Sequence, residues 1–141
     1  MAKLNSITLQ KLSSLRRKEA AALIKHKHFP AAYYLLGYSV ECALKACIAK
    51  QTERFDFPDK KLAHKAHTHE LEVLLGLAGL KNDFQVERGS NRTLDLNWTI
   101  VKDWNSESRY ELGITSSQAR DFYSACTSRK HGVLTWIRAR W

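Results

Sequence analysis

One long apolar segment carries a narrow polar stripe. At 100° per residue on a helix, Tyr34, Tyr38, Glu41 and Lys45 fall on one face. Glu41 and Lys45 are the only charged residues over 30–49, and Glu before Lys at a four-residue spacing favours pairing. Because a lone buried charge is strongly destabilising, the two must be paired or hydrogen-bonded. The stripe is therefore either a structural pair that fixes the helix in register or the polar mouth of a ligand pocket.

A cation from elsewhere in the chain would turn this stripe into an anion site. Arg109 lies in a polar connection, and His131 lies near the end of the sequence. If the stripe is the mouth of a pocket, we expect four residues to bind the ligand: Tyr38, Glu41, Lys45 and Arg109. His131 would join them. Glu41 would orient the cations, while Lys45 and Arg109 would meet a phosphate group.

The sequence gives no sign of metal or cofactor chemistry. Histidines crowd at His64, His67 and His69, but their spacing matches no zinc signature and no cysteine is nearby. The sequence also contains no glycine-rich phosphate loop, nucleophile elbow or paired-carboxylate motif. We therefore expect neither a metal nor a cofactor, and we assign the three histidines to a loop and a helix start.

Helices must position these residues, and hydrophobic periodicity predicts three of them in the first half of the chain. They cover about 6–26, 30–51 and 69–78. Ser6 and Thr68 are the expected N-caps, and Gly79 suits the C-terminal stop of the third helix. The second helix is apolar on nearly its whole circumference, which is typical of a buried central helix. A loop is expected over 51–61.

The second half of the chain is less regular. The pattern is weak over 80–89, where a short helix is one interpretation. Residues 93–104 fit a helical face, with an extended strand nearly as good a fit. A polar connection follows over 105–113. The last helix is expected to begin at a Thr115 cap, with 127–132 as a candidate interruption.

Composition agrees with a single all-α domain over residues 1–141. The chain has 6 Gly and 2 Pro, too few for a turn-rich β fold. The predicted elements form an all-α bundle with short connections. Long uncharged apolar stretches and a signal peptide are both missing, so we expect no membrane span and a cytoplasmic protein. The cysteines lack the spacing of a disulfide framework and fit reduced thiols: Cys42, Cys47 and Cys126.

The charge balance points to acidic partners. Lys and Arg number 23 against 14 Asp and Glu, which gives a net charge of +9 and a pI near 9.6. Nucleic acid, a nucleotide or an acidic protein are the first candidates, and solubility alone is the other explanation. Lys11, Lys18 and Lys25 lie seven residues apart on one helical face. Such a stripe either faces solvent or follows a phosphate backbone.

The polar stripe belongs to a recognisable stretch. Residues 33–46, with the pattern Gly-Tyr-x-x-Glu-Cys-x-x-Lys, resemble the second helix of HEPN domains, the small helical nucleotide-binding domains of higher eukaryotes and prokaryotes. Three later stretches follow in the same order and are similar to one bacterial subgroup of that family: 69–75, 97–110 and 131–137. The resemblance spans about residues 30–141.

This resemblance implies an all-α fold, an up-and-down bundle of four or five helices, that is often a homodimer. It implies a toxin–antitoxin or defence setting, frequently beside a minimal nucleotidyltransferase. Many relatives are metal-independent RNases, whose site is an Arg followed, after four to six residues, by a His on a late helix. Two protomers bring two copies of that pair together. Such a site uses acid–base catalysis and cationic stabilisation of the transition state.

The chain departs from that catalytic pattern. Arg109, Arg120 and Arg129 all precede His131, but none at the required spacing. Arg120 and His131 are eleven residues apart, or about 16 Å on a continuous helix. We therefore expect a HEPN-like protein that binds RNA, a nucleotide or a nucleotidyltransferase partner, without the usual RNase site.

Two alternatives stay open. One is an RNase in which Arg109 or Arg120 acts with His131 across a dimer, and the other is a structural homodimer without a ligand.

Overall fold

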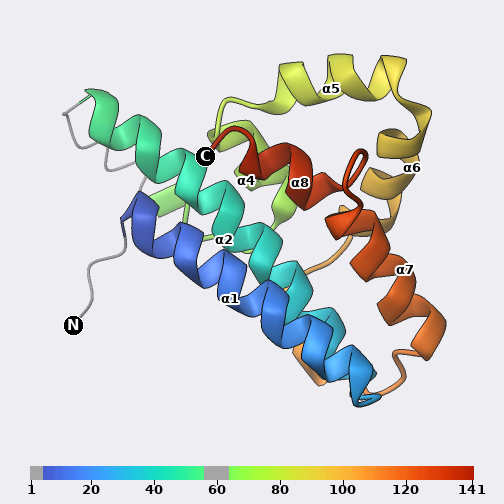
Figure 1. Cartoon of the computed structure of the whole chain (residues 1–141). Helices are drawn as coiled ribbons and strands as arrows, with labels where there is room; N and C mark the ends of the chain where they lie inside the picture. Colours follow the sequence, from blue (N-terminus) through green and yellow to red (C-terminus); the bar gives the residue numbers. More distant parts are fainter. Residues whose placement is uncertain (1–4, 56–63) are drawn as a thin grey trace.

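Two long antiparallel helices form the frame of the molecule (Figure 1). The computed structural model describes residues 5–55 and 64–141. Helix α1 covers Ser6–Lys25, helix α2 covers Phe29–Phe55, and the two pack along their lengths. The connection between them is short, with Lys27 in the left-handed region at φ 63°. A connection of this length makes neighbouring helices antiparallel.

Two small residues let α1 and α2 approach each other closely. The Ser13 hydroxyl donates to the Ser39 carbonyl at 2.7 Å, and the Ser39 hydroxyl donates to the Ser13 carbonyl at 2.6 Å. Both serines are fully buried. Each buried hydroxyl therefore has a partner on the other helix, which fixes the register of the pair.

The start of α1 differs from the prediction by one residue. Its N-cap is Asn5, not Ser6, because the Asn5 side chain accepts the backbone N–H of Thr8 at 2.8 Å. Ser6 is the first helical residue and is buried. Asn and Ser are equally good caps, so only the backbone geometry distinguishes the two positions.

The end of α2 lies beyond its predicted end. The loop expected over 51–61 is wrong for 51–55, which are helical, and residues 56–61 lie outside the described part. A tertiary contact accounts for part of this extension. The Gln51 amide donates to the Ala78 carbonyl and so ties the last turns of α2 to a later segment.

Six shorter helices complete the described residues. They are α4 (Leu71–Leu77), α5 (Lys81–Ser90), α6 (Arg92–Val101), the 3-10 helix η1 (Ser106–Tyr110), α7 (Ser116–Thr127) and α8 (Val133–Arg138). The all-α prediction is confirmed, and no strand occurs over 5–55 and 64–141. This part holds seven α-helices rather than four to five. The weak segment 80–89 is helical from residue 81 onward, as α5, and residues 128–132 break the last helix in two.

Local capping chemistry was predictable at two of the four positions, with Ser6 and Thr68 the two that differ. Thr115 caps α7 as expected, in a reciprocal capping box with Gln118. Gly79 follows the end of α4 with φ +71°, the conformation expected there. Thr68 is not the cap of α4, which begins at Leu71 with Glu70 in the N-cap position. The Thr68 hydroxyl instead accepts the Glu70 N–H at 3.2 Å, one turn before the helix.

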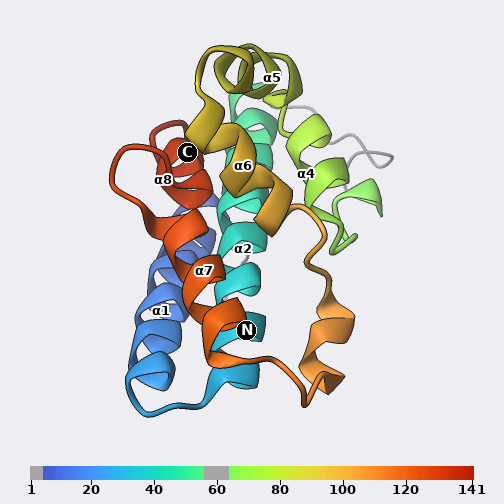
Figure 2. The same cartoon turned by 90° about the vertical axis from the view of Figure 1, so that its right-hand side faces the viewer.

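Helix α2 occupies the centre, as its apolar circumference predicted. It contacts α1, α4, η1, α7 and α8, and Figure 2 shows it with α1 and α7 on one side and α4 on the other. Its buried side chains share one core with those of the later helices. Within the described ranges, no helix combines the length and apolar character needed to cross a membrane.

Candidate functional site

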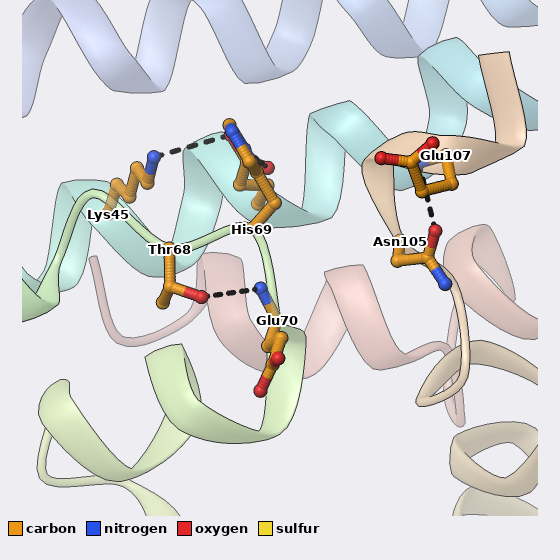
Figure 3. Close-up of polar contacts among 7 residues, drawn as sticks. Lys45, Thr68, His69, Glu70, Asn105 and Glu107 are labelled. Atoms are coloured by element: carbon orange, nitrogen blue, oxygen red, sulfur yellow. Dashed lines mark hydrogen bonds and ion pairs between the residues drawn. The ribbon is translucent and has the colours of Figure 1, made fainter.

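Glu41 is a buried carboxylate with two partners. It lies in α2 and is 2% exposed. Lys45 Nζ, one turn along the helix, lies 3.4 Å from Glu41 Oε2, and His69 Nδ1 lies 2.7 Å from Glu41 Oε1. Lys45 and His69 point toward the same spot from different elements (Figure 3). The predicted pairing of Glu41 with Lys45 is confirmed, and His69 is a third member that the sequence analysis did not include.

The contact with Glu41 determines how His69 can act. An ionised carboxylate only accepts hydrogen bonds, so His69 Nδ1 must carry the proton of the 2.7 Å bond. In the neutral ring this leaves a lone pair on Nε2, the far edge of the imidazole. The side chain is 49% exposed, so that edge is accessible. A buried carboxylate that orients an exposed imidazole is an arrangement suited to proton transfer or to hydrogen bonding with a ligand.

His69 lies on the wall of a hollow of about 530 Å³. Two segments line it: residues 68–72, before and in α4, and residues 102–107, which run from the end of α6 into η1. Hydrogen bonds fix both segments (Figure 3). Thr68 accepts the N–H of Glu70 at 3.2 Å, and Asn105 accepts the N–H of Glu107 at 2.9 Å. Each of the two lining segments is therefore held by a hydrogen bond between residues close together in the sequence.

Carboxylates dominate the lining of this hollow. They are Glu70, Glu72, Asp103 and Glu107. The lining also holds one lysine, Lys102, and the imidazole of His69. Carboxylates accept hydrogen bonds from hydroxyl and amino groups, which ribose and nucleobases carry. They repel phosphate. Across the described residues, no group of three His, Cys, Asp or Glu side chains is arranged to hold a metal ion.

Trp104 connects this hollow to α2. Its side chain is buried and contacts Gly37, where an added Cβ would overlap the indole ring. The Tyr34 ring stacks near it, with 6.1 Å between ring centroids. Gly37 therefore allows the segment after α6 to lie directly on the polar stripe. The stretches 33–46, 69–75 and 97–110, which carry the family resemblance, all meet here.

Tyr38 lies on the same stripe, between Tyr34 and Glu41. It is half-buried, and its ring centroid is 6.2 Å from that of Tyr34. Burial raises the pKa of the Tyr38 hydroxyl, with smaller contributions from Cys42 and Glu41. Tyr38 is thus held protonated and can donate a hydrogen bond.

Arg109 lies apart from the Glu41 cluster. Its guanidinium sits 4.8 Å from the centroid of the Tyr110 ring and is exposed. The Tyr110 hydroxyl, and more weakly Tyr34, raise the pKa of Arg109. Its neighbours are therefore tyrosines, and among the described contacts none joins Arg109 to Glu41 or Lys45.

His131 and Arg120 are held by other neighbours. His131 Nδ1 lies 3.0 Å from the Asn91 side-chain nitrogen, and the Asn97 amide donates to the His131 carbonyl at 2.7 Å. Arg120 donates to Ser116 at 3.0 Å and lies over the Phe29 ring. Within one chain, the structure brings neither residue to the other, nor to Arg109.

His69 is the residue that sequence reasoning missed. The sequence analysis noted the histidine cluster at His64, His67 and His69 but assigned it only to a loop and a helix start. Glu41 and His69 are 28 residues apart, and no local spacing signals such a contact. A buried Glu on an apolar helix does indicate that some partner must exist.

Comparison of the chain with protein-family models, curated proteins and solved structures found no match.

Proposed function

We propose that this chain is a HEPN-like helical protein that binds RNA or a nucleotide at the hollow beside His69. The observation that carries the proposal is the 2.7 Å bond by which buried Glu41 orients an exposed His69 on the wall of that hollow. The surrounding carboxylates suit ribose hydroxyls and base amino groups. The net charge of +9 favours the approach of a polyanion.

Lys45 has a different role in this proposal from the one its sequence position suggested. Its ammonium faces Glu41 and is only 21% exposed, so it neutralises the buried carboxylate. Lys102, on the rim of the hollow, is the cation placed to meet a ligand phosphate. Glu41 and Lys45 then position His69, while His69 and Lys102 contact the ligand.

The test is binding of a fluorescein-labelled single-stranded RNA, and separately of a labelled mononucleotide, followed by anisotropy. His69→Ala should weaken binding on the order of tenfold, the effect of losing one charge-assisted hydrogen bond. His67→Ala is the matched control, because His67 is also exposed but does not line the hollow. Equal affinities for the two variants would contradict the proposal.

A second candidate function is metal-independent RNA cleavage, with His69 in place of His131. The same carboxylate–histidine bond favours it, because Nδ1 faces Glu41 and no hydrogen bond among the described residues uses His69 Nε2, which can then take a proton. In that reaction the 2′-hydroxyl gives its proton to Nε2 and the 2′-oxygen attacks the adjacent phosphorus. A cyclic phosphate forms, and the departing 5′-oxygen takes a proton from water.

Incubation of labelled total RNA with the protein in excess chelator separates the two functions. His69→Gln keeps a donor toward Glu41 but removes the proton acceptor, so it should abolish cleavage while RNA still binds. His131→Ala should leave cleavage intact. If His131→Ala instead removes cleavage, the catalytic site is the one first predicted around His131 with Arg109 or Arg120. If the unmodified protein does not cleave the RNA, binding remains the proposed function and cleavage is excluded.

The nucleotidyltransferase-type partner, the toxin–antitoxin or defence setting and the homodimer are parts of the same proposal. They rest on the resemblance of residues 33–46 and the later stretches. Co-purification with the product of a neighbouring gene, and the mass of the protein in solution, test them directly.

A further inference from the structure

A second hollow, of about 250 Å³, lies between α1, α7 and α8. Its lining is strongly basic, with Arg17, Lys18 and Arg138 beside Ser14, Ala21 and Tyr123. No carboxylate is among these residues. The lining of this hollow is positively charged, whereas that of the hollow beside His69 is acidic.

The cations of this hollow lack neutralising partners among the described ion pairs. Arg16, the neighbour of Arg17, pairs with Glu19, whereas Arg17, Lys18 and Arg138 appear in none of the pairs. Three positive charges around one concavity repel one another. An anion placed there would remove that repulsion.

Arg138 is held in position by the end of the chain. Its guanidinium lies 5.2 Å from the centroid of the Trp141 ring. The Trp141 carbonyl in turn accepts a hydrogen bond from Lys50 at 3.3 Å, which ties the end of the chain to α2. A guanidinium packed on an aromatic ring loses less freedom when it binds a ligand than a free one.

We propose that this second hollow is a phosphate-binding site. Guanidinium groups match phosphate oxygens in bidentate geometry, and Ser14 and Tyr123 in the lining carry hydroxyls of the kind that donate to phosphate. The volume of about 250 Å³ accommodates a phosphate group together with several waters, each of which needs about 30 Å³.

The surroundings favour a strand of RNA as the source of that phosphate. Lys18 belongs both to the hollow and to the exposed row Lys11, Lys18 and Lys25 on α1. At 1.5 Å per residue this row extends over about 21 Å. A strand following the row would place one phosphate in the hollow. This source rests on the proposed function, whereas a free nucleotide or pyrophosphate would use the same phosphate chemistry.

The first experiment measures RNA affinity against salt, from about 50 to 200 mM KCl. The variant R17A/R138A removes two charges from the hollow, and K81A/R92A removes two exposed charges from α5 and α6. R17A/R138A should bind on the order of tenfold more weakly. Its salt slope should fall by about 0.7 to 1.4, the effect of one or two lost contacts with a single strand. K81A/R92A should match the unmodified chain. Arg17→Gln, which leaves the Arg138–Trp141 contact intact, should show part of the effect.

The second experiment replaces RNA with inorganic pyrophosphate and records thermal stability. Pyrophosphate should raise the melting temperature of the unmodified chain and of K81A/R92A, but not of R17A/R138A. A pyrophosphate effect without RNA binding would support the site with a small phosphate ligand and contradict the proposed RNA function. The phosphate site is refuted if R17A/R138A and K81A/R92A behave alike toward both ligands.

Discussion

The indole of Trp104 lies against the backbone of Gly37, at the one face of α2 that also carries Glu41 and Lys45. Any side chain at position 37 would occupy the space of the ring. This contact holds residues 102–107 on α2 and so places one wall of the acidic hollow close to His69. Gly37 therefore matters for packing, although it lies in the middle of a helix, where glycine lowers stability relative to alanine.

Gly37→Ala should destabilise the protein by about 1–3 kcal/mol, the usual effect of overpacking a buried site. The added methyl group would force Trp104 off α2, so the variant should also bind RNA more weakly. Urea denaturation followed by tryptophan fluorescence measures the first effect. Gly76→Ala is the control: Gly76 lies in α4 with open space around it, so this variant should gain about 0.5–1 kcal/mol. A stable Gly37→Ala protein would mean that the Trp104 contact is not tight.

The helices themselves were largely predictable from the sequence, but the site was predictable only in part. Periodicity located α1, α2 and α7, and the Thr115 capping box is a local signal that the sequence carries in full. The Glu41–Lys45 pair is local as well, one helical turn apart. The roles of His69 and Trp104 depend on contacts between segments far apart in the sequence, and spacing carries no information on those.

Glu41→Gln should destabilise the protein by about 1–3 kcal/mol. The substitution keeps the volume but removes the buried charge, which leaves Lys45 and His69 facing a neutral amide. Glu19→Gln breaks the half-exposed pair with Arg16 and should cost less than about 1 kcal/mol. Urea denaturation of both variants gives the comparison. Similar losses for the two would show that Glu41 behaves as a surface carboxylate.

The three cysteines should react slowly with a thiol reagent in the folded protein. Burial raises the pKa of Cys42 to about 12 and that of Cys47 to about 11, and it raises the pKa of Cys126 most strongly. Because the thiolate is the reactive form, we expect Cys126 to react last and all three to react at once in urea. Reaction with a chromogenic disulfide, followed with time, checks the order. Fast labelling of the native protein would contradict it.

The same thiols predict how stability changes with alkaline pH. A raised pKa in the folded state means that folding favours the protonated thiol. This stabilisation is fully present below the ordinary thiol pKa of 9.0 and is lost as pH rises through about 11 to 12. Urea denaturation at increasing alkaline pH should therefore show falling stability. A variant with alanine at Cys42 and Cys47 should show a shallower fall, and an equal fall would assign the loss to other groups.

His69 and His131 should be opposite tautomers when both are neutral. His69 keeps its proton on Nδ1 and donates it in a hydrogen bond to Glu41. The side-chain oxygen of Asn91, Oδ1, accepts the Leu94 N–H, which turns the side-chain nitrogen of Asn91 toward His131 Nδ1 at 3.0 Å. An amide nitrogen only donates, so the His131 proton must be on Nε2.

Imidazole nitrogen shifts in a ¹⁵N-labelled sample at about pH 8, above the usual titration of histidine, distinguish the two forms. Asn91→Asp should reverse the His131 tautomer, because a carboxylate oxygen would then face Nδ1, while His69 stays as it was. The Asp side chain can still cap α6, so the helix should remain folded. An unchanged His131 in this variant would show that Asn91 does not control the ring, and a His69 proton on Nε2 would remove the basis for its orientation by Glu41.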